Sequence, residues 1–331
     1  MKNPNFFIGP MSKNVVDTII EFCNRTNTHI GLIPSRRQIE HTKGYVNNWS
    51  TKDFVEYVRS KTDKILLVRD HSGPSQGEFE DDGLESLSVD CKYLDVIHID
   101  PWKRYQDLDS GIEKTIELIN YCHSINNEIE FEIGTEESIR KFEPQEIEYL
   151  IVQLQKRLSL KTYKQIKYLV IQSGTSLKET NQTGNYSSTR LESMIEIVKK
   201  YNLISKEHNG DYITVEKIYD KFKIGLDSIN IAPEFGVIET NTYLNEINEE
   251  DFLEFYKICY ESKKWVKWVN EGFDPENNKK ELVKICGHYI LSTEEFVDKI
   301  KNKIPNIDQK VRENINKKLE QLIFFDKNIY S

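Results

Sequence analysis

Residues 96–134 read VIHIDPWKRYQDLDSGIEKTIELINYCHSINNEIEFEIG and contain one complete strand–helix–strand unit. The apolar runs Val96–Asp100 and Ile129–Gly134 each close on a polar residue or glycine, which is typical of buried parallel strands. Between them, Asp109–Tyr121 carries apolar residues at three- and four-residue spacing, the pattern of an amphipathic helix. The stretch therefore predicts one βαβ unit of a parallel sheet.

The same alternation continues through most of the 331 residues. Further predicted strands are Thr28–Pro34, Lys64–Asp70, Tyr168–Gln172, Leu203–His208 and Ser228–Pro233, with an eighth expected near Lys284–Leu291. Further predicted helices are Val15–Phe22, Gln145–Leu158 and Thr189–Tyr201. Repeated units of this kind predict an α/β protein, a single (β/α)₈ TIM-barrel domain that spans residues 1–331.

Two segments near the C-terminus extend this barrel pattern. Residues 239–280 are longer than a barrel helix requires and are rich in Trp, Tyr and Lys. They predict an inserted helical hairpin that covers the barrel mouth or makes a subunit contact. Residues 306–331 open with a charged amphipathic pattern that predicts a C-terminal helix.

Composition narrows the classes of partner. A net charge of −9 argues against a protein that binds nucleic acid or an anionic membrane, because both partners select a basic face. The five cysteines form no CxxC pair, which favours free thiols over a disulfide scaffold or a zinc finger. The N-terminal apolar run Phe6-Phe7-Ile8 is far shorter than a signal-peptide core. We therefore expect a cytoplasmic protein whose ligands are small molecules.

Polar residues close several predicted strands, and in a parallel barrel the reacting groups lie at these C-terminal strand ends. Asp70 and His71 follow the apolar run Ile65–Val68 after a single residue, Arg69. Such a pair can hold a metal through the imidazole while the carboxylate moves a proton. The alternative is an aspartate that caps the following turn beside a surface histidine.

Two neighbouring strands add further acids. His98 and Asp100 share one face of their strand, as do Glu130 and Glu132 on the next, because side chains alternate with a period of two. Buried carboxylates require a cation, a basic neighbour or a shifted pKa. An edge strand with solvated acids is the alternative for the glutamate pair.

His208 supplies a second imidazole at the barrel mouth, where a lone histidine is equally explained as a metal ligand or as a turn residue. His71, His208 and the carboxylate of Glu132 would leave room for a substrate oxygen, the open arrangement of catalytic zinc or manganese sites. Gln172 and the polar loop that contains Asn185 offer groups suited to sugar hydroxyls, although a solvated loop explains them equally well. The remaining histidines and the cysteines are expected to be structural, except that the role of His288 in Gly287-His288-Tyr289 is left open.

Several short segments, in the order in which they follow along the chain, resemble the accessory-subunit branch of the class II tagatose-bisphosphate aldolases. This family also includes ketose and uronate C4-epimerases. The resemblance covers roughly residues 28–240. The first matched segment has two parts, Ser35 and Gln38 through Gly44-Tyr45, and Ser50-Thr51-Lys52-Asp53-Phe54. The other matched segments are Asp70-His71-Ser72-Gly73-Pro74, Ile97-His98-Ile99-Asp100, Ile133-Gly134-Thr135-Glu136, Gln172-Ser173-Gly174, His208 through Asp211-Tyr212, and Ala232-Pro233-Glu234.

The resemblance implies a role for each matched position. His71 and His208 would be metal ligands and Asp70 the proton-transfer carboxylate, with Glu136 a second acid of the site and Glu132 its competitor on that strand. The implied cofactor is zinc, with manganese as the alternative. The implied chemistry is aldol cleavage or C4-epimerisation of a ketose or sugar acid through a metal-stabilised enediolate. A non-catalytic subunit that stabilises an aldolase, or a barrel that binds sugar without reaction, remains an alternative.

The chain departs from the family at Ser35-Arg36-Arg37-Gln38, where a neutral Ser-Asn-Gln pattern is usual, and Lys103 and Arg104 follow the third predicted strand. These cations predict an anionic sugar or sugar-phosphate substrate, because arginine suits phosphate and carboxylate geometry. Copies of this chain or a catalytic aldolase subunit are the candidate protein partners. The predicted substrate-binding set is Ser35, Arg36, Arg37, Gln38, Asp100, Gln172, Asn185 and Asp211.

Overall fold

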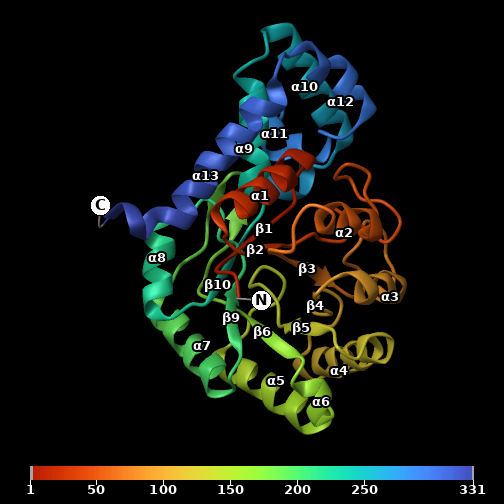
Figure 1. Ribbon diagram of the computed structural model, residues 1–331, viewed down its shortest axis with the longest axis vertical. Helices are drawn as coiled ribbons and strands as arrows, with labels where there is room; N and C mark the ends of the chain where they lie inside the picture. Colours follow the sequence, from red (N-terminus) through yellow and green to blue (C-terminus); the bar gives the residue numbers. More distant parts are fainter. Residues whose placement is uncertain (1–2, 330–331) are drawn as a thin grey trace.

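The computed structural model describes residues 3–329, in which eight parallel strands close into a barrel surrounded by helices (Figure 1). The chain is therefore a (β/α)₈ TIM barrel, as predicted. Around the barrel the strands follow in the order β1 (Phe6–Ile8), β2 (Ile30–Leu32), β3 (Ile65–Ser72), β4 (Val96–Ile99), β5 (Glu130–Ile133), β6 (Ile166–Ile171), β9 (Ile204–Glu207) and β10 (Ser228–Ile231). The short antiparallel strands β7 (Leu177–Lys178) and β8 (Asn181–Gln182) form a separate hairpin.

Side-chain alternation along these strands builds two apolar regions. Residues that point outward pack beneath the helices in one large core. Residues that point inward form a small apolar cluster within the barrel: Phe7, Ile33, Val68, Val96 and Tyr168. The polar site described below lies beyond this cluster, at the C-terminal ends of the strands.

The eighth strand is not where the sequence placed it. Lys284–Leu291 lies in α11 (Lys279–Cys286) and the 3₁₀ helix η2 (Gly287–Tyr289), and the strand is instead β1. β1 pairs with both β10 and β2, through Phe7↔Asn230 and Phe7↔Gly31. Three residues are too few to show a periodic pattern, so only the pairing on both sides identifies this strand.

Helices alternate with the strands around the barrel. Those of the barrel are α1 (Lys13–Thr26), α2 (Thr51–Arg59), α3 (Leu84–Tyr93), α4 (Leu108–Ile125), α5 (Pro144–Arg157), α6 (Leu160–Tyr163), α7 (Ser188–Lys200) and α8 (Val215–Ile224). Those that follow β10 are α9 (Pro233–Leu244), α10 (Glu249–Ser262), η1 (Val266–Trp268), α11, η2, α12 (Glu294–Lys299), η3 (Lys301–Lys303) and α13 (Ile307–Ile329). No helix in residues 3–329 is both long enough and apolar enough to cross a membrane.

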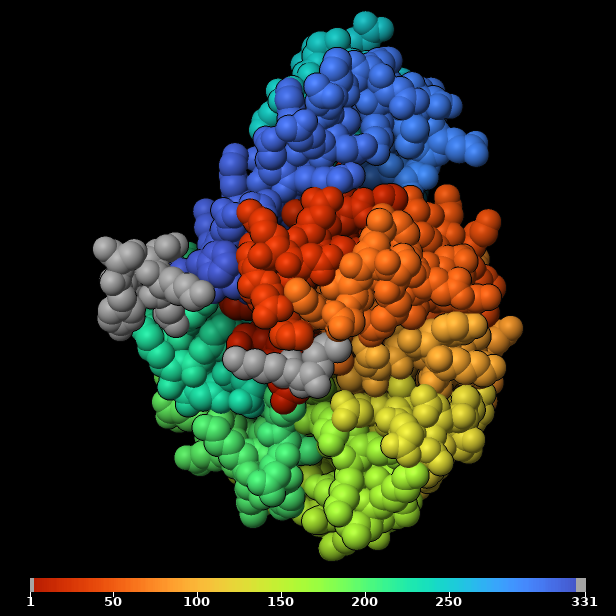
Figure 2. All heavy atoms as spheres, viewed as in Figure 1, coloured from red at the N-terminus to blue at the C-terminus, as the bar shows by residue number. Residues whose placement is uncertain are grey.

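Helices α10 to α12 form a lobe that stands out from the rounded barrel (Figures 1 and 2). The α10 helix packs against α11 and α12, and α9 connects the lobe to the barrel. The chain then returns along α13, which packs against α1, α8 and α9 and so completes the helical ring. Residues 330–331 of the predicted C-terminal helix lie outside the described residues.

Candidate functional site

Three imidazoles meet at the C-terminal end of the barrel. They belong to His71 at the end of β3, His98 in β4 and His208 just after β9. Their ring centroids lie 5.0, 5.2 and 5.1 Å apart, which makes a nearly equilateral triangle. One ligand atom from each ring and one from Asp70 all lie within 4.8 Å of one another.

The backbone at β3 is bent so that two consecutive side chains reach this site. The register between β3 and β4 shifts between Arg69 and Ser72, and His71 adopts a φ of 47°. In a regular strand Asp70 and His71 would point to opposite faces, whereas here both line one cavity. A left-handed conformation at a residue other than glycine costs on the order of 1–3 kcal/mol, and such strain is concentrated at functional sites.

Each ring is oriented by a hydrogen bond at the nitrogen that faces away from the site. His71 Nδ1 lies 2.5 Å from Asp100 Oδ2, and that carboxylate also accepts a bond from Thr135 Oγ1. His98 Nε2 lies 3.0 Å from the carbonyl oxygen of Gly134. Donation at these positions leaves His71 Nε2 and His98 Nδ1 as acceptors, although the His71 backbone N–H also approaches His98 Nδ1 at 3.2 Å. Protein partners of this kind fix the tautomer and orientation of metal-binding histidines.

Glu132 orients the third ring rather than joining the cluster. One of its oxygens lies 2.8 Å from His208 Nε2, and the other accepts a 2.6 Å bond from the buried ammonium of Lys206. Burial opposes ionisation of Glu132, but the charges of Lys206, His98 and His208 hold its pKa well below the usual range. Both oxygens are thus occupied, and His98, rather than the predicted Glu132, lies in the group of side chains that could hold a metal ion.

Asp70 lies between the three rings. Its Oδ1 is 3.9 Å from both His98 Nδ1 and His208 Nδ1, and its Oδ2 is 3.8 Å from His71 Nε2. These separations are too long for hydrogen bonds. Among the described residues, the buried Oδ1 has no hydrogen-bond partner. Three imidazole nitrogens around a carboxylate form a donor set that suits zinc or manganese.

The electrostatics of His71 fit a cation at this position. Burial lowers its pKa, but the carboxylates of Asp70, Asp100 and Glu136 outweigh burial and raise the pKa to about 10. His71 is therefore an imidazolium in the protein without metal, and its Nε2 becomes an acceptor only when that second proton is lost. A divalent cation would replace that positive charge, since metal binding to histidine competes with protonation.

The cluster opens into a cavity of about 650 Å³. Its walls come from the barrel mouth and from the helical lobe, which contributes Lys267, Trp268, His288 and Tyr289. Of the site residues predicted from the sequence, the cavity is lined by Ser35, Arg37, Gln38, Asp70, His71, Glu136, His208 and Asp211.

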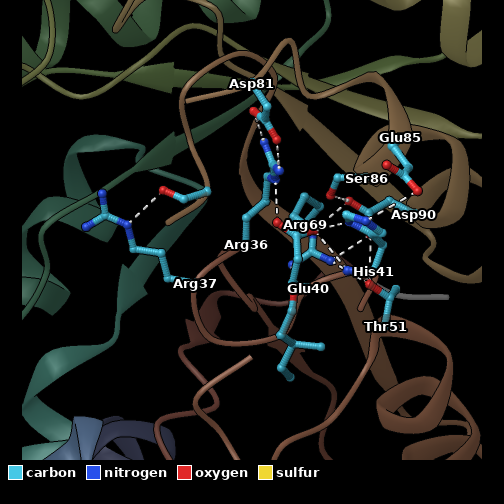
Figure 3. Close-up of polar contacts among 12 residues, drawn as sticks. Arg36, Arg37, Glu40, His41, Thr51, Arg69, Asp81, Glu85, Ser86 and Asp90 are labelled. Atoms are coloured by element: carbon cyan, nitrogen blue, oxygen red, sulfur yellow. Dashed lines mark hydrogen bonds and ion pairs between the residues drawn. The ribbon is translucent and has the colours of Figure 1, made fainter. Parts of the chain in front are cut away.

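Arg36 does not line this cavity. Its side chain is buried and contacts Asp81 at 2.5 Å, Glu40 at 2.9 Å and the Gly73 carbonyl oxygen at 3.1 Å. Figure 3 shows Arg36 directed toward Asp81, while Arg37 extends away from this ion pair. Arg36 thus ties the loop after β2 to the loop after β3, so it is not retained as a substrate contact.

Three other residues predicted to bind substrate also lie outside the cavity lining. Asp100 is fully buried behind His71. The Gln172 amide accepts a bond from the Phe142 backbone and donates to the carbonyl oxygens of Thr135 and Arg140, which leaves it committed to loop structure. Asn185 lies exposed in the loop after β8.

Asn230 is a cavity residue that sequence reasoning missed. It lies in β10 and is 4% exposed, and neither polar atom of its amide has a hydrogen-bond partner among the described residues. Buried amides are normally satisfied, so this one is available to a ligand. The signal in the sequence was an amide inside the apolar strand Ser228–Ile231.

No family model and no curated protein matches the sequence. A structure titled as a probable tagatose 6 phosphate kinase from Sinorhizobium meliloti superposes with a TM-score of 0.76 at 13% identity, covering 97% of this chain and 99% of that one. The fructuronate-tagaturonate epimerase UxaE from Cohnella laeviribosi gives 0.66 at 10% identity, covering 96% and 81%. The YdjI aldolase from Escherichia coli gives 0.52 at 12% identity, covering 90% and 91%. At these identities the likeness establishes the barrel fold.

Proposed function

We propose that the protein is a metal-dependent sugar enzyme of the class II aldolase or epimerase type, acting on an anionic ketose or sugar acid. The observation that carries this proposal is the triangle of His71, His98 and His208 around Asp70, which opens into a cavity at the barrel mouth. Structures titled as an aldolase and as a sugar-acid epimerase share the fold, which supports the proposal.

The residues present fit a divalent cation, zinc in first place and manganese as the alternative. His71, His98 and His208 would hold it, with Asp100, the Gly134 carbonyl and Glu132 fixing their rings. A bound cation would supply Lewis acidity that polarises a substrate carbonyl.

We assign proton transfer to Asp70. Asp70 lines the cavity next to the imidazoles, and its buried Oδ1 has no hydrogen-bond partner among residues 3–329, so its carboxylate can take a proton from a substrate bound there. Glu136 lines the same cavity and is held by a 2.5 Å bond from Ser138 Oγ, which suits it to a second acid–base role. The free amide of Asn230 would bind a substrate hydroxyl or carbonyl.

The proposal is tested by assaying ketose phosphates and uronates for cleavage and for C4-epimerisation, with purified protein before and after chelation. Activity that disappears on chelation and returns with zinc or manganese is the expected result. Turnover that survives complete removal of metal would contradict the proposal. If no turnover appears until a catalytic aldolase subunit is added, the accessory-subunit alternative is favoured instead.

A further inference from the structure

Three cationic side chains line the same cavity as the imidazoles, and each comes from a different segment. Arg37 lies in the loop after β2, Lys103 in the loop after β4 and Lys267 in η1 of the helical lobe. Within the described part of the chain, none of the three forms an ion pair with a carboxylate. Their neighbours differ in this respect, because Lys264 pairs with Glu78 and Arg36 with Asp81.

Arg37 and Lys103 are each held by a bond to a backbone carbonyl oxygen. Arg37 donates from Nε to the Gly77 carbonyl oxygen at 3.1 Å, and Figure 3 shows its guanidinium reaching away from the Arg36 ion pair. Lys103 Nζ donates to the Ser75 carbonyl oxygen at 2.5 Å. Carbonyl groups position these side chains without neutralising them.

Lys267 is placed by aromatic rings. Its ammonium lies 4.4 Å from the centre of the Trp268 ring and 5.6 Å from that of Tyr289, both of which line the cavity. Trp268 Nε1 donates to Tyr289 Oη at 2.9 Å, which holds the two rings together. The lobe therefore places the Lys267 ammonium at the barrel mouth, next to two aromatic rings that are hydrogen-bonded to each other.

The like charges act on one another. Although the Lys267 residue as a whole is exposed, desolvation of its ammonium, followed by the charges of Arg37, Lys103 and Lys264, lowers its pKa. The pKa of Lys103 is also lowered, by burial and then by Arg37, against the weaker opposing effect of Glu80 and Asp100. Cations gathered without a counter-ion repel each other, and a bound anion would relieve that repulsion.

His288 adds a neutral group to this part of the cavity. Burial and the charge of Lys267 lower its pKa to about 3, so the ring is uncharged at neutral pH. Its Nδ1 is buried without a hydrogen-bond partner among the described residues. Neutral His288 can therefore hydrogen-bond a ligand without adding to the repulsion.

We propose that Arg37, Lys103 and Lys267 form a subsite for the phosphate group of a phosphorylated sugar, with the helical lobe supplying the third cation. A guanidinium and two ammonium groups match a dianion with three acceptor oxygens better than a monoanionic carboxylate with two. This inference rests on the proposed function for the sugar part of the substrate. Binding of the phosphate group itself needs no metal.

The test is calorimetric titration of inorganic phosphate into metal-stripped protein at neutral pH, for the wild type, Lys267→Gln, Lys103→Gln and Lys267→Arg. The control is Lys257→Gln, which removes an exposed lysine of α10 outside the cavity. We expect the two glutamine variants in the cavity to weaken phosphate binding by at least about tenfold. Lys267→Arg and the control should bind as the wild type does, which separates loss of charge from loss of fold.

The subsite would be overturned by no phosphate binding to the wild type, or by equal binding to all five proteins. Glucuronate provides a second arm, since competition by this carboxylate as strong as that of phosphate would also count against a phosphate subsite. Metal titration of the same proteins is independent of these outcomes. Metal binding without phosphate binding would contradict the subsite but not the proposed function. Phosphate binding without metal binding would support the subsite and contradict the proposed function.

Discussion

Asp70 and His71 show how much a single backbone angle decides at the residue scale. The left-handed φ of His71 turns both side chains into the cavity, where regular alternation would have separated them. The sequence identified the pair because it closes an apolar run. It could not rank His98 above Glu132, since the two are cross-strand partners on the same face. The buried Lys206 on β9 pairs with Glu132, and His98 is the member of the two that lies in the group able to hold a metal ion.

Asp100→Asn tests whether this carboxylate positions His71. The amide removes the negative charge that holds the ring, so we expect metal affinity to fall by about 10–100-fold while the fold is kept. Affinity is measured by competition with a chelator. Asp107→Asn, at the exposed N-cap of α4, is the control. Unchanged affinity in Asp100→Asn would show that the hydrogen bond to His71 has no such role.

Asp70→Asn separates proton transfer from metal binding. If Asp70 carries the proton, the variant should retain its metal and lose turnover by a factor of about 10²–10⁴. Metal content and rate are measured on the same preparation. Loss of the metal together with the rate would instead identify Asp70 as a ligand, as its position between the three rings also permits.

At the scale of elements, the strands that carry the site were predictable and the one that closes the barrel was not. Seven strands show as apolar runs that end in polar residues, but β1 spans only Phe6–Ile8 and depends on long-range pairing. Lys284–Leu291, which was predicted as the eighth strand, is apolar because Ile285 and Cys286 of α11 are buried in the helical lobe. The local sequence pattern shows that a segment is buried. It cannot show whether the segment is buried as a strand of the barrel or as a helix of the lobe.

The connection between β9 and β10 should make stability depend on pH through Asp211. Burial and the charge of Glu234 raise the pKa of this carboxyl to about 8, although it accepts bonds from the backbone of Ala232 and Glu234. The folded state therefore holds a proton that the unfolded state releases above about pH 4. Stability contributed by this group is lost as pH rises toward 8.

Asp211→Asn should remove this dependence, because the amide oxygen can accept the same backbone bonds without titrating. Between pH 5 and 8 the free energy of unfolding of the wild type should fall more steeply than that of the variant, by up to about 1.4 kcal/mol per pH unit. Urea denaturation at several pH values measures both. Parallel profiles would mean that Asp211 ionises normally in the folded protein.

At the scale of the whole molecule, α13 joins the last part of the chain to the first. Its buried residues Val311, Ile315, Leu319 and Leu322 follow helical spacing, and the helix packs against α1, α8 and α9. The charged amphipathic pattern predicted this helix, but not that it would complete the ring. The helical segment before α13 was predicted either to cover the barrel mouth or to make a subunit contact. Residues of the lobe line the cavity at the barrel mouth, which agrees with the first of these roles.

Leu319→Ala tests the contribution of this closure to stability. Removal of a fully buried leucine side chain should lower the free energy of unfolding by about 2–5 kcal/mol, whereas Lys317→Ala on the exposed face should change it by less than about 0.5 kcal/mol. Chemical denaturation followed by circular dichroism gives both values. Equal stability of the two variants would mean that α13 is not part of the cooperative barrel.

The central claim is that three imidazoles from separate strands hold one metal ion, and it is tested most directly by the metal content of purified protein. Inductively coupled plasma mass spectrometry would compare the wild type with His98→Ala, the His71→Ala, His208→Ala double variant and the control His123→Gln, whose ring bonds Gln165 outside the cavity. We predict close to one zinc or manganese per chain in the wild type and control, and its loss in the other two. No metal in the wild type after reconstitution, or full retention in His98→Ala, would contradict the claim.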